Sequence, residues 1–227
     1  MKLSVIIPAY NEHGTILKIL ESVNSISFNK EIIVIDDCST DGTREVLENV
    51  DMPGLRVMLH ERNQGKGAAI QTGLSAVTGD IVVVQDADLE YNPQDWFRMM
   101  PLIEEGRADV VYGSRFSGSD AHRVLYFWHM IGNRLITLAS NMFTNLNLTD
   151  VETCYKMFTR QIADRLVINE KRFGAEIEMT AKLAKMKCVI YEVGISYAGR
   201  TYEQGKKIGW RDGIRAFYCI IRYNLFS

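Results

Sequence analysis

The chain of 227 residues is long enough to bury a large core, and its 47% apolar and 24% charged residues are typical of a globular protein. Its formal net charge of −2 excludes a generally basic, nucleic-acid-binding surface, so an anionic ligand would need a local basic site. The 4 cysteines form no C-x-x-C pair and the 4 histidines no H-E-x-x-H motif, so we expect isolated thiols in a reducing compartment rather than zinc.

In the first half of the chain, short apolar runs alternate with segments of helical periodicity. Strands are predicted at LSVIIP (3–8), EIIVIDD (31–37), RVMLH (56–60), DIVVVQDAD (80–88) and ADVVYGS (108–114). Helices are predicted around 16–23, from near Thr43, within 66–77 and near 94–103. Strands that are apolar on both faces and separated by helices indicate a mostly parallel sheet in an α/β fold.

The second half has longer helical segments. We predict a helix within 121–148, a short strand at TCYKMF (153–158), a helix at 175–186, one or two strands within 187–199 and an amphipathic helix within 206–227. No hydrophilic linker divides the chain, so residues 1–227 are predicted to form a single domain with halves 1–118 and 119–227.

Acidic and polar clusters follow three of the predicted strands. They are PAYNE (8–12), DDCSTDGT (36–43) and DADLE (86–90). Ligands of open α/β sheets bind beyond the carboxyl ends of the strands, so these clusters are expected to meet in one crevice. A Walker A loop would need glycine at 60 or 200, where the chain has His60 and Arg200, and no G-x-G-x-x-G follows the first strand. A nucleotide is therefore expected to be held by side chains and a metal.

Asp86, Asp88 and Glu90 stand at alternate positions and point the same way if the backbone stays extended. Three oxygen donors on one face suit Mg²⁺ or Mn²⁺. The alternative is a solvated acidic turn before a helix that begins at Asn92 and Pro93.

After the second strand, Ser39 or Thr40 can cap the next helix, and we assign Asp41 to that cap as well. This leaves Asp36 and Asp37 for a ligand, because an acid after the second strand is well placed to bond a ribose or a base.

Together these motifs make the chain resemble the family-2 glycosyltransferases, which are inverting, metal-dependent enzymes with the GT-A nucleotide-sugar fold. The segments VIIPAYNE, VIDDCSTDGT, NQGKGAAIQTG, GDIVVVQDADLEYNP and GSRF occur in the family's order and cover nearly the whole chain. Within the family, the chain looks most similar to the dolichyl- or polyprenyl-phosphate hexose synthases.

The resemblance implies that residues 1–118 bind a nucleotide sugar and residues 119–227 bind the acceptor. It implies a nucleotide-sugar pocket formed by Pro8, Ala9, Tyr10, Glu12, Asp36, Asp37, Lys66 and Asp86. It also implies that Asp86, Asp88 and Glu90 surround the metal, with Asp88 the main ligand and Glu90 in a position that is often glutamine.

Basic residues provide further candidates. Arg115 follows the fifth strand at the same crevice and can pair with a phosphate bidentately, or it can be a surface arginine. Residues 200–210 form a glycine-containing basic loop, and in relatives such a segment closes over the diphosphate. This implicates Arg200, Lys206 and Lys207, and the alternative is a solvated basic loop.

The resemblance implies transfer of a hexose from a GDP-mannose- or UDP-glucose-type donor to a polyprenyl phosphate. A phosphate acceptor is largely ionised near neutral pH and needs no base, whereas a hydroxyl acceptor does. Asp150 falls where family members carry an aspartate near the acceptor, and Glu176 is a second candidate base, but either can be a capping or salt-bridged acid. The base motif of hydroxyl-using relatives is not found, which favours the phosphate. Asp88, Arg115 and Asp150 are thus the candidate catalytic residues.

No segment reaches the ~20 apolar residues of a membrane span, and the N-terminal apolar run is too short for a signal peptide. We therefore expect a cytoplasmic protein that is peripheral to a membrane. Residues 124–131 (VLYFWHMI) or 217–226 would rest at the bilayer interface. The alternatives are that both segments pack in the core or in a dimer, or that a membrane-anchored partner exists.

Three other functions remain open. They are transfer to a sugar or lipid hydroxyl, sugar nucleotidyl transfer, and nucleotide-sugar binding without catalysis. A nucleotidyltransferase would carry a glycine-rich basic loop after the first strand, where this chain has PAYNEHG. The intact acidic cluster and Arg115 argue against a non-catalytic protein.

Overall fold

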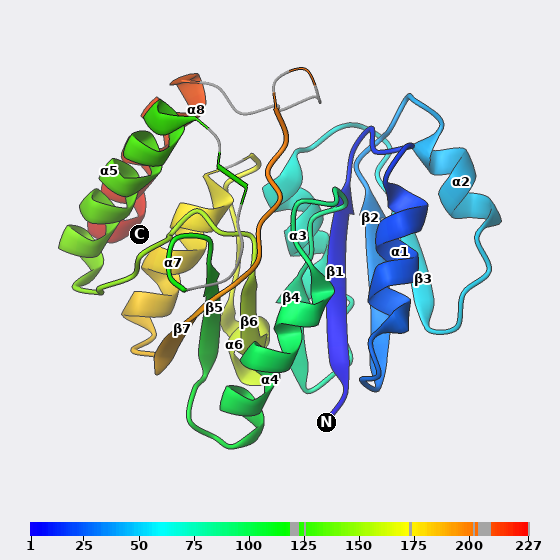
Figure 1. Ribbon diagram of the computed structural model, residues 1–227, viewed down its shortest axis with the longest axis horizontal. Coiled ribbons are helices and arrows are strands. Elements are labelled where there is room, and N and C mark those ends of the chain that lie inside the picture. The colour runs from blue at the N-terminus through cyan, green and yellow to red at the C-terminus, as the bar shows by residue number, and fades with distance from the viewer. Residues whose placement is uncertain (119–122, 125, 173, 202, 204–209, 227) are drawn as a thin grey trace.

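The computed structural model describes residues 1–118, 123–124, 126–172, 174–201, 203 and 210–226 (Figure 1). Its centre is a seven-stranded sheet with the order β3-β2-β1-β4-β6-β5-β7. The strands are β1 (Leu3–Ala9), β2 (Lys30–Asp36), β3 (Leu55–Leu59), β4 (Ile81–Val84), β5 (Val110–Ser114), β6 (Lys156–Thr159) and β7 (Ile190–Gly194). β6 runs antiparallel to β4 and β5, and the other neighbours are parallel. The predicted mostly parallel α/β sheet is confirmed.

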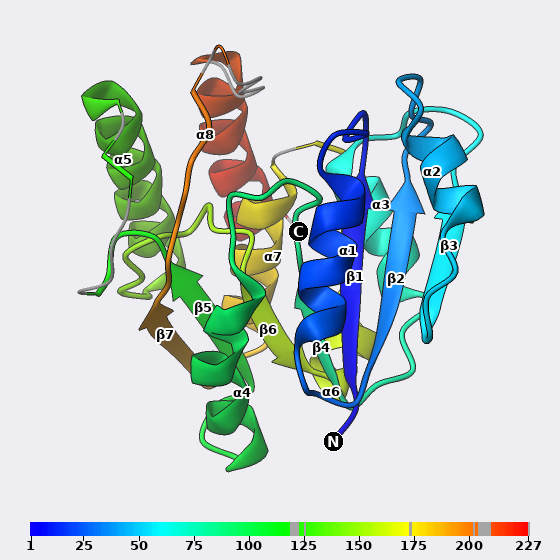
Figure 2. The same cartoon turned by 45° about the vertical axis from the view of Figure 1, so that its right-hand side comes forward.

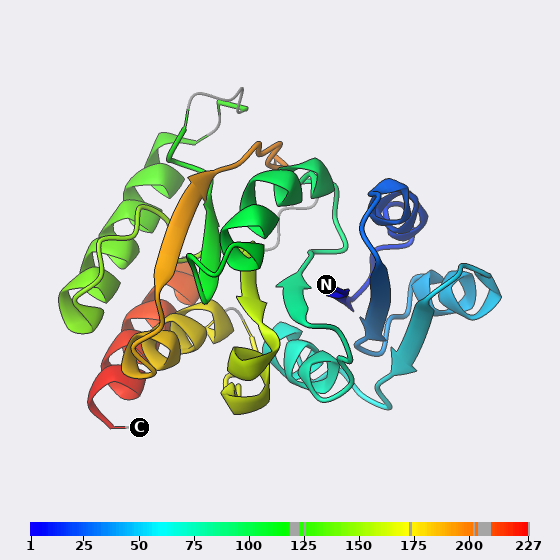
Figure 3. The same cartoon turned by 90° about the horizontal axis from the view of Figure 1, so that it is seen from below.

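Helices cover both faces of the sheet. They are α1 (Ile16–Ser25), α2 (Thr43–Asn49), α3 (Lys66–Leu74), α4 (Trp96–Glu104) after a short 3₁₀ turn (Pro93–Asp95), α5 (Phe127–Thr144), α6 (Arg160–Arg165), α7 (Ala175–Lys185) and α8 (Trp210–Leu225). Figure 3 shows α1 and α4 on one face and α3, α6 and α7 on the other. This two-sided cover explains why the central strands read as unbroken apolar runs.

Burial is complete where the sheet is covered on both sides. All residues of β4, which are Ile81, Val82, Val83 and Val84, are at most 1% exposed. Each fully buried aliphatic side chain of this kind contributes about 1.5–3 kcal/mol to stability. A second, smaller core lies between α5, α7 and α8. Figure 2 shows α8 between α7, which covers the sheet, and α5, which stands outside the β7 edge.

The first turn of α3 lies directly against the backbone of residues 170–171. A Cβ atom on Gly67 would be 1.8 Å from the carbonyl oxygen of Glu170, and the Gly67 amide donates to the carbonyl of Lys171 at 3.0 Å. The preceding Gly65 has φ +94°, a conformation that favours glycine. The glycines of NQGKG are therefore needed for close packing between the two halves of the chain.

The fourth strand is shorter than predicted. β4 ends at Val84, and residues 87–90 form bends, so Asp86, Asp88 and Glu90 are not on an extended strand. The prediction of a strand over 80–88 was wrong at its end, because the chain bends there and its carboxylates pair with two cations, Asp86 with Lys66 and both Asp88 and Glu90 with Arg200. Within the described residues, no helix is long and apolar enough to cross a membrane.

Candidate active site

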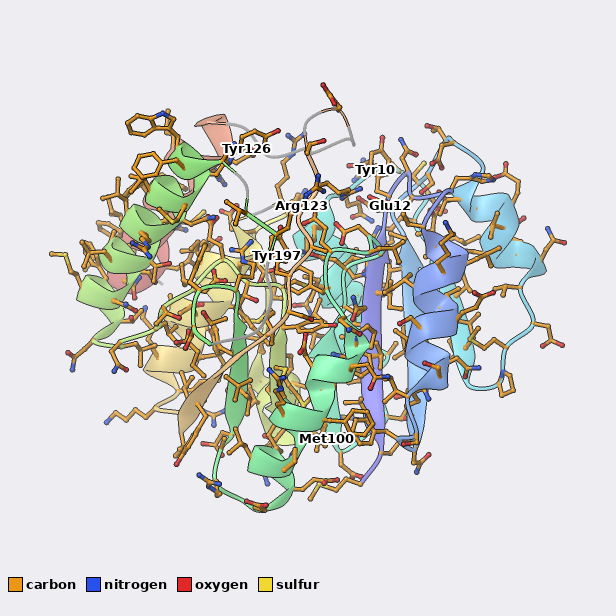
Figure 4. The ribbon with its side chains drawn as sticks, in the orientation of Figure 1. Tyr10, Glu12, Met100, Arg123, Tyr126 and Tyr197 are labelled. Carbon is orange, nitrogen blue, oxygen red and sulfur yellow. The ribbon has the colours of Figure 1, made fainter. Side chains whose placement is uncertain are left out.

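The site lies at the carboxyl edge of the parallel strands. β1 leads to Tyr10, which is 39% exposed, and to the largely buried Glu12. Figure 4 shows both residues toward one end of the molecule, with Arg123 beside them and Tyr197 nearer the centre, whereas Met100 lies toward the opposite end. Parallel strands bring their carboxyl ends to one edge, which is why residues far apart in sequence meet there.

Arg200 is the centre of an acidic cluster. Its guanidinium lies 2.7 Å from Asp88, 3.1 Å from Glu90 and 3.5 Å from Glu12. The Arg200 side chain is 24% exposed and the three carboxylates are 11–14% exposed. Four residues predicted from three separate segments of the chain are therefore in direct contact.

The segment that carries Arg200 is fixed by its neighbours. The Tyr197 hydroxyl donates to Glu90 at 2.6 Å, and the Ala198 amide donates to the carbonyl of Glu90 at 2.9 Å. Arg123 donates to the carbonyl of Gly199 at 3.0 Å. Tyr197 and Arg123 were not predicted, because only the fold brings residues 197–200 next to Glu90.

Asp88 is the most strongly perturbed acid of the cluster. Burial raises the pKa of its carboxyl to about 7, and the charges of Asp86 and Glu90 add to the rise, while Arg200 opposes it. A nearby cation stabilises the ionised form of a carboxyl in this environment, because it offsets the repulsion between the like charges of the cluster.

Asp86 has a different cation. It lies 2.7 Å from the Lys66 ammonium, which is also 3.3 Å from Glu176. On its other side, Glu176 pairs at 2.6 Å with the fully buried Lys156, which donates to the carbonyls of Val151 and Thr153. The sequence left two alternatives for Glu176, a catalytic base or a capping or salt-bridged acid, and the structure shows it in salt bridges.

Arg115 and Asp150 form one buried ion pair. The Arg115 Nε and Nη2 atoms donate to the two carboxylate oxygens at 2.7 and 2.8 Å, and the Arg115 amide donates at 3.0 Å. Asp150 is fully buried, and the Tyr197 ring lies 5.2 Å from the guanidinium. The surface-arginine alternative was wrong, and the fork expected to bind a phosphate bidentately is occupied by Asp150.

Asp36, the last residue of β2, and Asp37, which follows it, are buried and used by the fold. Asp36 accepts from Arg44 at 2.7 and 2.9 Å. Asp37 bonds His60 Nδ1 at 2.7 Å and accepts from the amides of Gln64 and Gly65 at 2.8 and 2.6 Å. The Asp37 carboxylate therefore shapes the loop that enters α3, and the Asp36 carboxylate holds Arg44 of α2. The prediction that Asp36 and Asp37 are left for a ligand did not include these structural roles.

Other predicted residues are placed as follows. Pro8 and Ala9 end β1 beside β2, and the Ala9 carbonyl accepts from the Asp37 amide at 2.8 Å. Asp41 accepts from the Thr43 amide at 3.0 Å, but the N-cap residue of α2 is Gly42, and Ser39 accepts from the Asn11 amide rather than capping the helix. Lys206 and Lys207 lie outside the described residues.

Glu152 is a titratable residue that the sequence did not single out. Burial raises the pKa of its carboxyl to about 7 despite the attraction of Arg115, and Asp150 and Glu176 raise it further. Nothing in the pattern TDVET distinguishes a buried glutamate from a solvated one. The charges of the nearby Arg115–Asp150 pair act on Glu152, whose carboxyl changes charge near neutral pH.

The fold has clear structural relatives. Glucosyl-3-phosphoglycerate synthase from Mycobacterium tuberculosis, solved with Mn²⁺, UDP and glucosyl-3-phosphoglycerate, superposes with a TM-score of 0.75 at 20% identity, covering 98% of this chain and 80% of that one. Staphylococcus aureus TarS 1–349 with UDP-GlcNAc gives 0.65 at 21% identity, covering 100% of this chain and 68% of that one. The sheet and its helical layers are those of a GT-A glycosyltransferase.

The sequence comparison identifies the family. Residues 4–167 match the family described as Glycosyl transferase family 2, and the chain belongs to that family. An undecaprenyl-phosphate 4-deoxy-4-formamido-L-arabinose transferase from Pseudomonas syringae pv. syringae is 30% identical over 177 residues, covering 74% of this chain and 50% of that protein. The transferase of the same name from Aeromonas hydrophila subsp. hydrophila is 29% identical over 210 residues, covering 89% and 62%.

These names confirm the expected similarity to polyprenyl-phosphate sugar transferases. The chain spans only 50% to 62% of the length of these two relatives.

Proposed function

We propose that this chain is an inverting glycosyltransferase that moves a hexose from a GDP- or UDP-linked donor to a polyprenyl phosphate. The observation that carries the proposal is the cluster of Glu12, Asp88, Glu90 and Arg200 at the carboxyl edge of a family-2 fold. The names of the relatives support the lipid phosphate as acceptor. In this proposal Tyr10 and Glu12 lie against the nucleotide, and Lys66 and Arg200 offset charge on its diphosphate.

We propose a divalent cation, Mg²⁺ or Mn²⁺, held by Asp86, Asp88 and Glu90. Their carboxylate oxygens are the donors that these ions prefer. Structural relatives were crystallised with Mn²⁺ or Mg²⁺ and UDP. Among the described residues, no three His, Cys, Asp or Glu side chains are gathered in a geometry that could hold a metal. When bound, the cation would offset charge on the leaving nucleoside diphosphate.

The state of Asp150 suits a phosphate acceptor. Both of its carboxylate oxygens accept from Arg115, so this aspartate is already engaged in a bidentate ion pair and does not face an acceptor hydroxyl with an unoccupied oxygen. A phosphomonoester is largely ionised near pH 7 and attacks without a base. The second candidate is a hydroxyl acceptor, which Glu152 favours because a pKa of about 7 suits a general base.

We also propose that the start of α5 contacts the membrane that holds the lipid acceptor. Val124, Phe127 and Trp128 are 86%, 60% and 78% exposed. Figure 4 places Tyr126 near the same edge of the molecule as Tyr10 and Glu12. Exposed aromatic and aliphatic side chains at one edge are typical of surfaces that enter the lipid headgroup region. This placement would bring a membrane-bound phosphate close to the candidate site.

The test is a matrix of nucleotide sugars against undecaprenyl phosphate and free sugars, with Mg²⁺ or Mn²⁺, read by product mass. We expect a glycosyl-phospholipid product, and a loss of about 100-fold or more in kcat/KM for Asp88→Asn. Asp164→Asn, at an exposed surface pair, is the matched control and should keep full activity. Products formed only with hydroxyl acceptors would contradict the lipid-phosphate assignment.

A further inference from the structure

The acidic cluster that the proposed function assigns to a divalent cation is bound by the protein's own cations. Asp86 is paired with Lys66, and Asp88 and Glu90 are paired with Arg200. Arg200 is separated from Asp88 by 112 positions, so this contact is a product of the fold. A metal at the proposed site and the Arg200 guanidinium would need the same carboxylates.

Every carboxylate oxygen of Asp88 and Glu90 already accepts a hydrogen bond. The oxygens of Asp88 accept from Arg200 at 2.7 Å and from the Glu90 amide at 3.1 Å. One oxygen of Glu90 accepts from the amide and Nε of Arg200 at 2.8 and 3.1 Å, and the other accepts from Tyr197 at 2.6 Å. A metal ligated by these oxygens would have to replace the Arg200 side-chain bonds.

Two cations cannot both lie between these carboxylates. At about 4 Å, like unit charges repel by about 4 kcal/mol with an effective dielectric constant of 20, and a divalent ion doubles the repulsion. At the same time, three carboxylates share one guanidinium, so the cluster still has excess negative charge that attracts a cation. The arrangement therefore favours a divalent cation that replaces the Arg200 guanidinium over one that binds beside it.

The neighbouring contacts allow the side chain to leave without its backbone. Ala198 and Gly199 are held by hydrogen bonds to the Glu90 carbonyl and from Arg123, and neither bond uses the guanidinium. The Arg200 side chain can therefore rotate while residues 197–199 keep their place. A guanidinium released from carboxylates is suited to bond a diphosphate, since it binds both groups in the same bidentate manner.

We propose that Arg200 is an exchangeable counter-ion of the acidic cluster. It neutralises Asp88, Glu90 and Glu12 in the unliganded protein, and it moves to the donor diphosphate when a divalent cation takes its place. The proposal rests on the proposed function and adds the energetic coupling of two ligands to it. The cation binds weakly when it is the only ligand and tightly when the nucleotide is also bound. Metal and nucleoside diphosphate then assist each other's binding to the same extent, as linkage requires.

The experiment measures Mn²⁺ affinity by calorimetry and by the free-ion signal in electron paramagnetic resonance, with and without saturating UDP or GDP. We expect Arg200→Ala to bind Mn²⁺ alone about 10-fold more tightly than the wild type, and to gain less from the nucleotide. Arg200→Lys, which keeps a cation, should remain close to the wild type. Arg215→Ala, which removes an ion pair with Glu170 elsewhere, is the matched control.

Circular dichroism checks that each variant is folded, and Arg200→Gln replaces Arg200→Ala if the alanine variant is not. If Arg200→Ala binds Mn²⁺ as tightly as the wild type or more weakly, the proposed exchange is wrong. That result would leave the proposed function standing. A wild type that binds no Mn²⁺ with either nucleotide overturns the proposed metal site itself.

Discussion

Burial alone does not decide the charge of a carboxylate in this protein, as Glu31 and Glu152 show. Burial by itself acts to raise the pKa of both carboxyls. For Glu31, hydrogen bonds from Ser4 and Thr78 outweigh burial and lower the pKa to about 2. Among the described residues, no hydrogen bond of this kind lowers the pKa of Glu152, which rises to about 7. The number of hydrogen bonds to the ionised form is what separates the two residues.

Glu152 is expected to make the protein less stable as the pH rises. Its folded pKa lies above the unfolded value, so the folded state keeps a proton that the unfolded chain loses between about pH 4.3 and 7. Glu152→Gln, which cannot ionise, should raise the free energy of unfolding by about 1–3 kcal/mol at pH 8 and leave it unchanged at pH 4. Urea unfolding at the two pH values measures this difference.

The exposed Glu21→Gln on α1 is the control for that experiment, and it should show no such dependence. An equal effect of Glu152→Gln at pH 4 and pH 8 would contradict the raised pKa.

At the scale of elements, one buried glutamate ties three strands together at the amino edge of the sheet. Glu31 of β2 accepts from Ser4 of β1 at 2.5 Å. It also accepts from the amide and hydroxyl of Thr78 at 2.6 and 2.8 Å, just before β4, and from Lys2 at 3.1 Å. At the end of the sheet opposite the candidate site, the Glu31 side chain thus links β1, β2 and the segment that precedes β4.

Glu31→Gln should lower the free energy of unfolding by about 1–3 kcal/mol at pH 7, because several bonds to a charged acceptor are weakened. The folded pKa lies below the unfolded one, so the stabilisation is present above about pH 4.3 and is lost as the pH falls toward 2. The difference in the free energy of unfolding between variant and wild type should therefore become smaller in unfolding curves recorded at decreasing pH. A gap that stays constant down to pH 3, or an equal effect of the exposed Glu48→Gln, would refute the assignment.

At the scale of the whole molecule, the helices beyond β5 and β7 leave many large apolar side chains exposed. α5 presents Leu138 and Met142 at 57% and 76% exposure, besides the residues at its start. α8 packs against α5 and α7 through Ile220 and Tyr223 and exposes Ile214 and Leu225 on other sides. Exposed apolar side chains on neighbouring helices are a typical feature of interaction surfaces.

Vesicle co-sedimentation tests the membrane contact proposed for the start of α5. We expect the wild type to sediment with vesicles that contain undecaprenyl phosphate and anionic lipid. The double variant Phe127→Ser, Trp128→Ser should reduce binding about 10-fold or more, because the apolar contact is lost. Leu17→Ser, at an exposed leucine of α1, is the matched control. A wild type that stays in the supernatant would rule the contact out.

The amino-acid sequence by itself determined the α/β architecture and the edge where the site lies. Both follow from local patterns, since apolar runs indicate buried strands and parallel strands place their carboxyl ends at one edge. The motifs PAYNE, DADLE and GSRF could therefore be assigned to one crevice before any contact was known. The antiparallel β6 between β4 and β5 was not predicted, because strand order depends on long-range pairing rather than on periodicity.

Only the tertiary structure decided which charges are paired. Arg200 lies with Asp88 and Glu90, Lys66 with Asp86, and Arg115 with Asp150, and each partner comes from a distant part of the chain. A charged residue in a sequence carries no mark of its partner, because ion pairing depends on distance and burial in the folded protein. The acidic stretch after β4 is thus a local feature, but the cation that stabilises it is set by the fold.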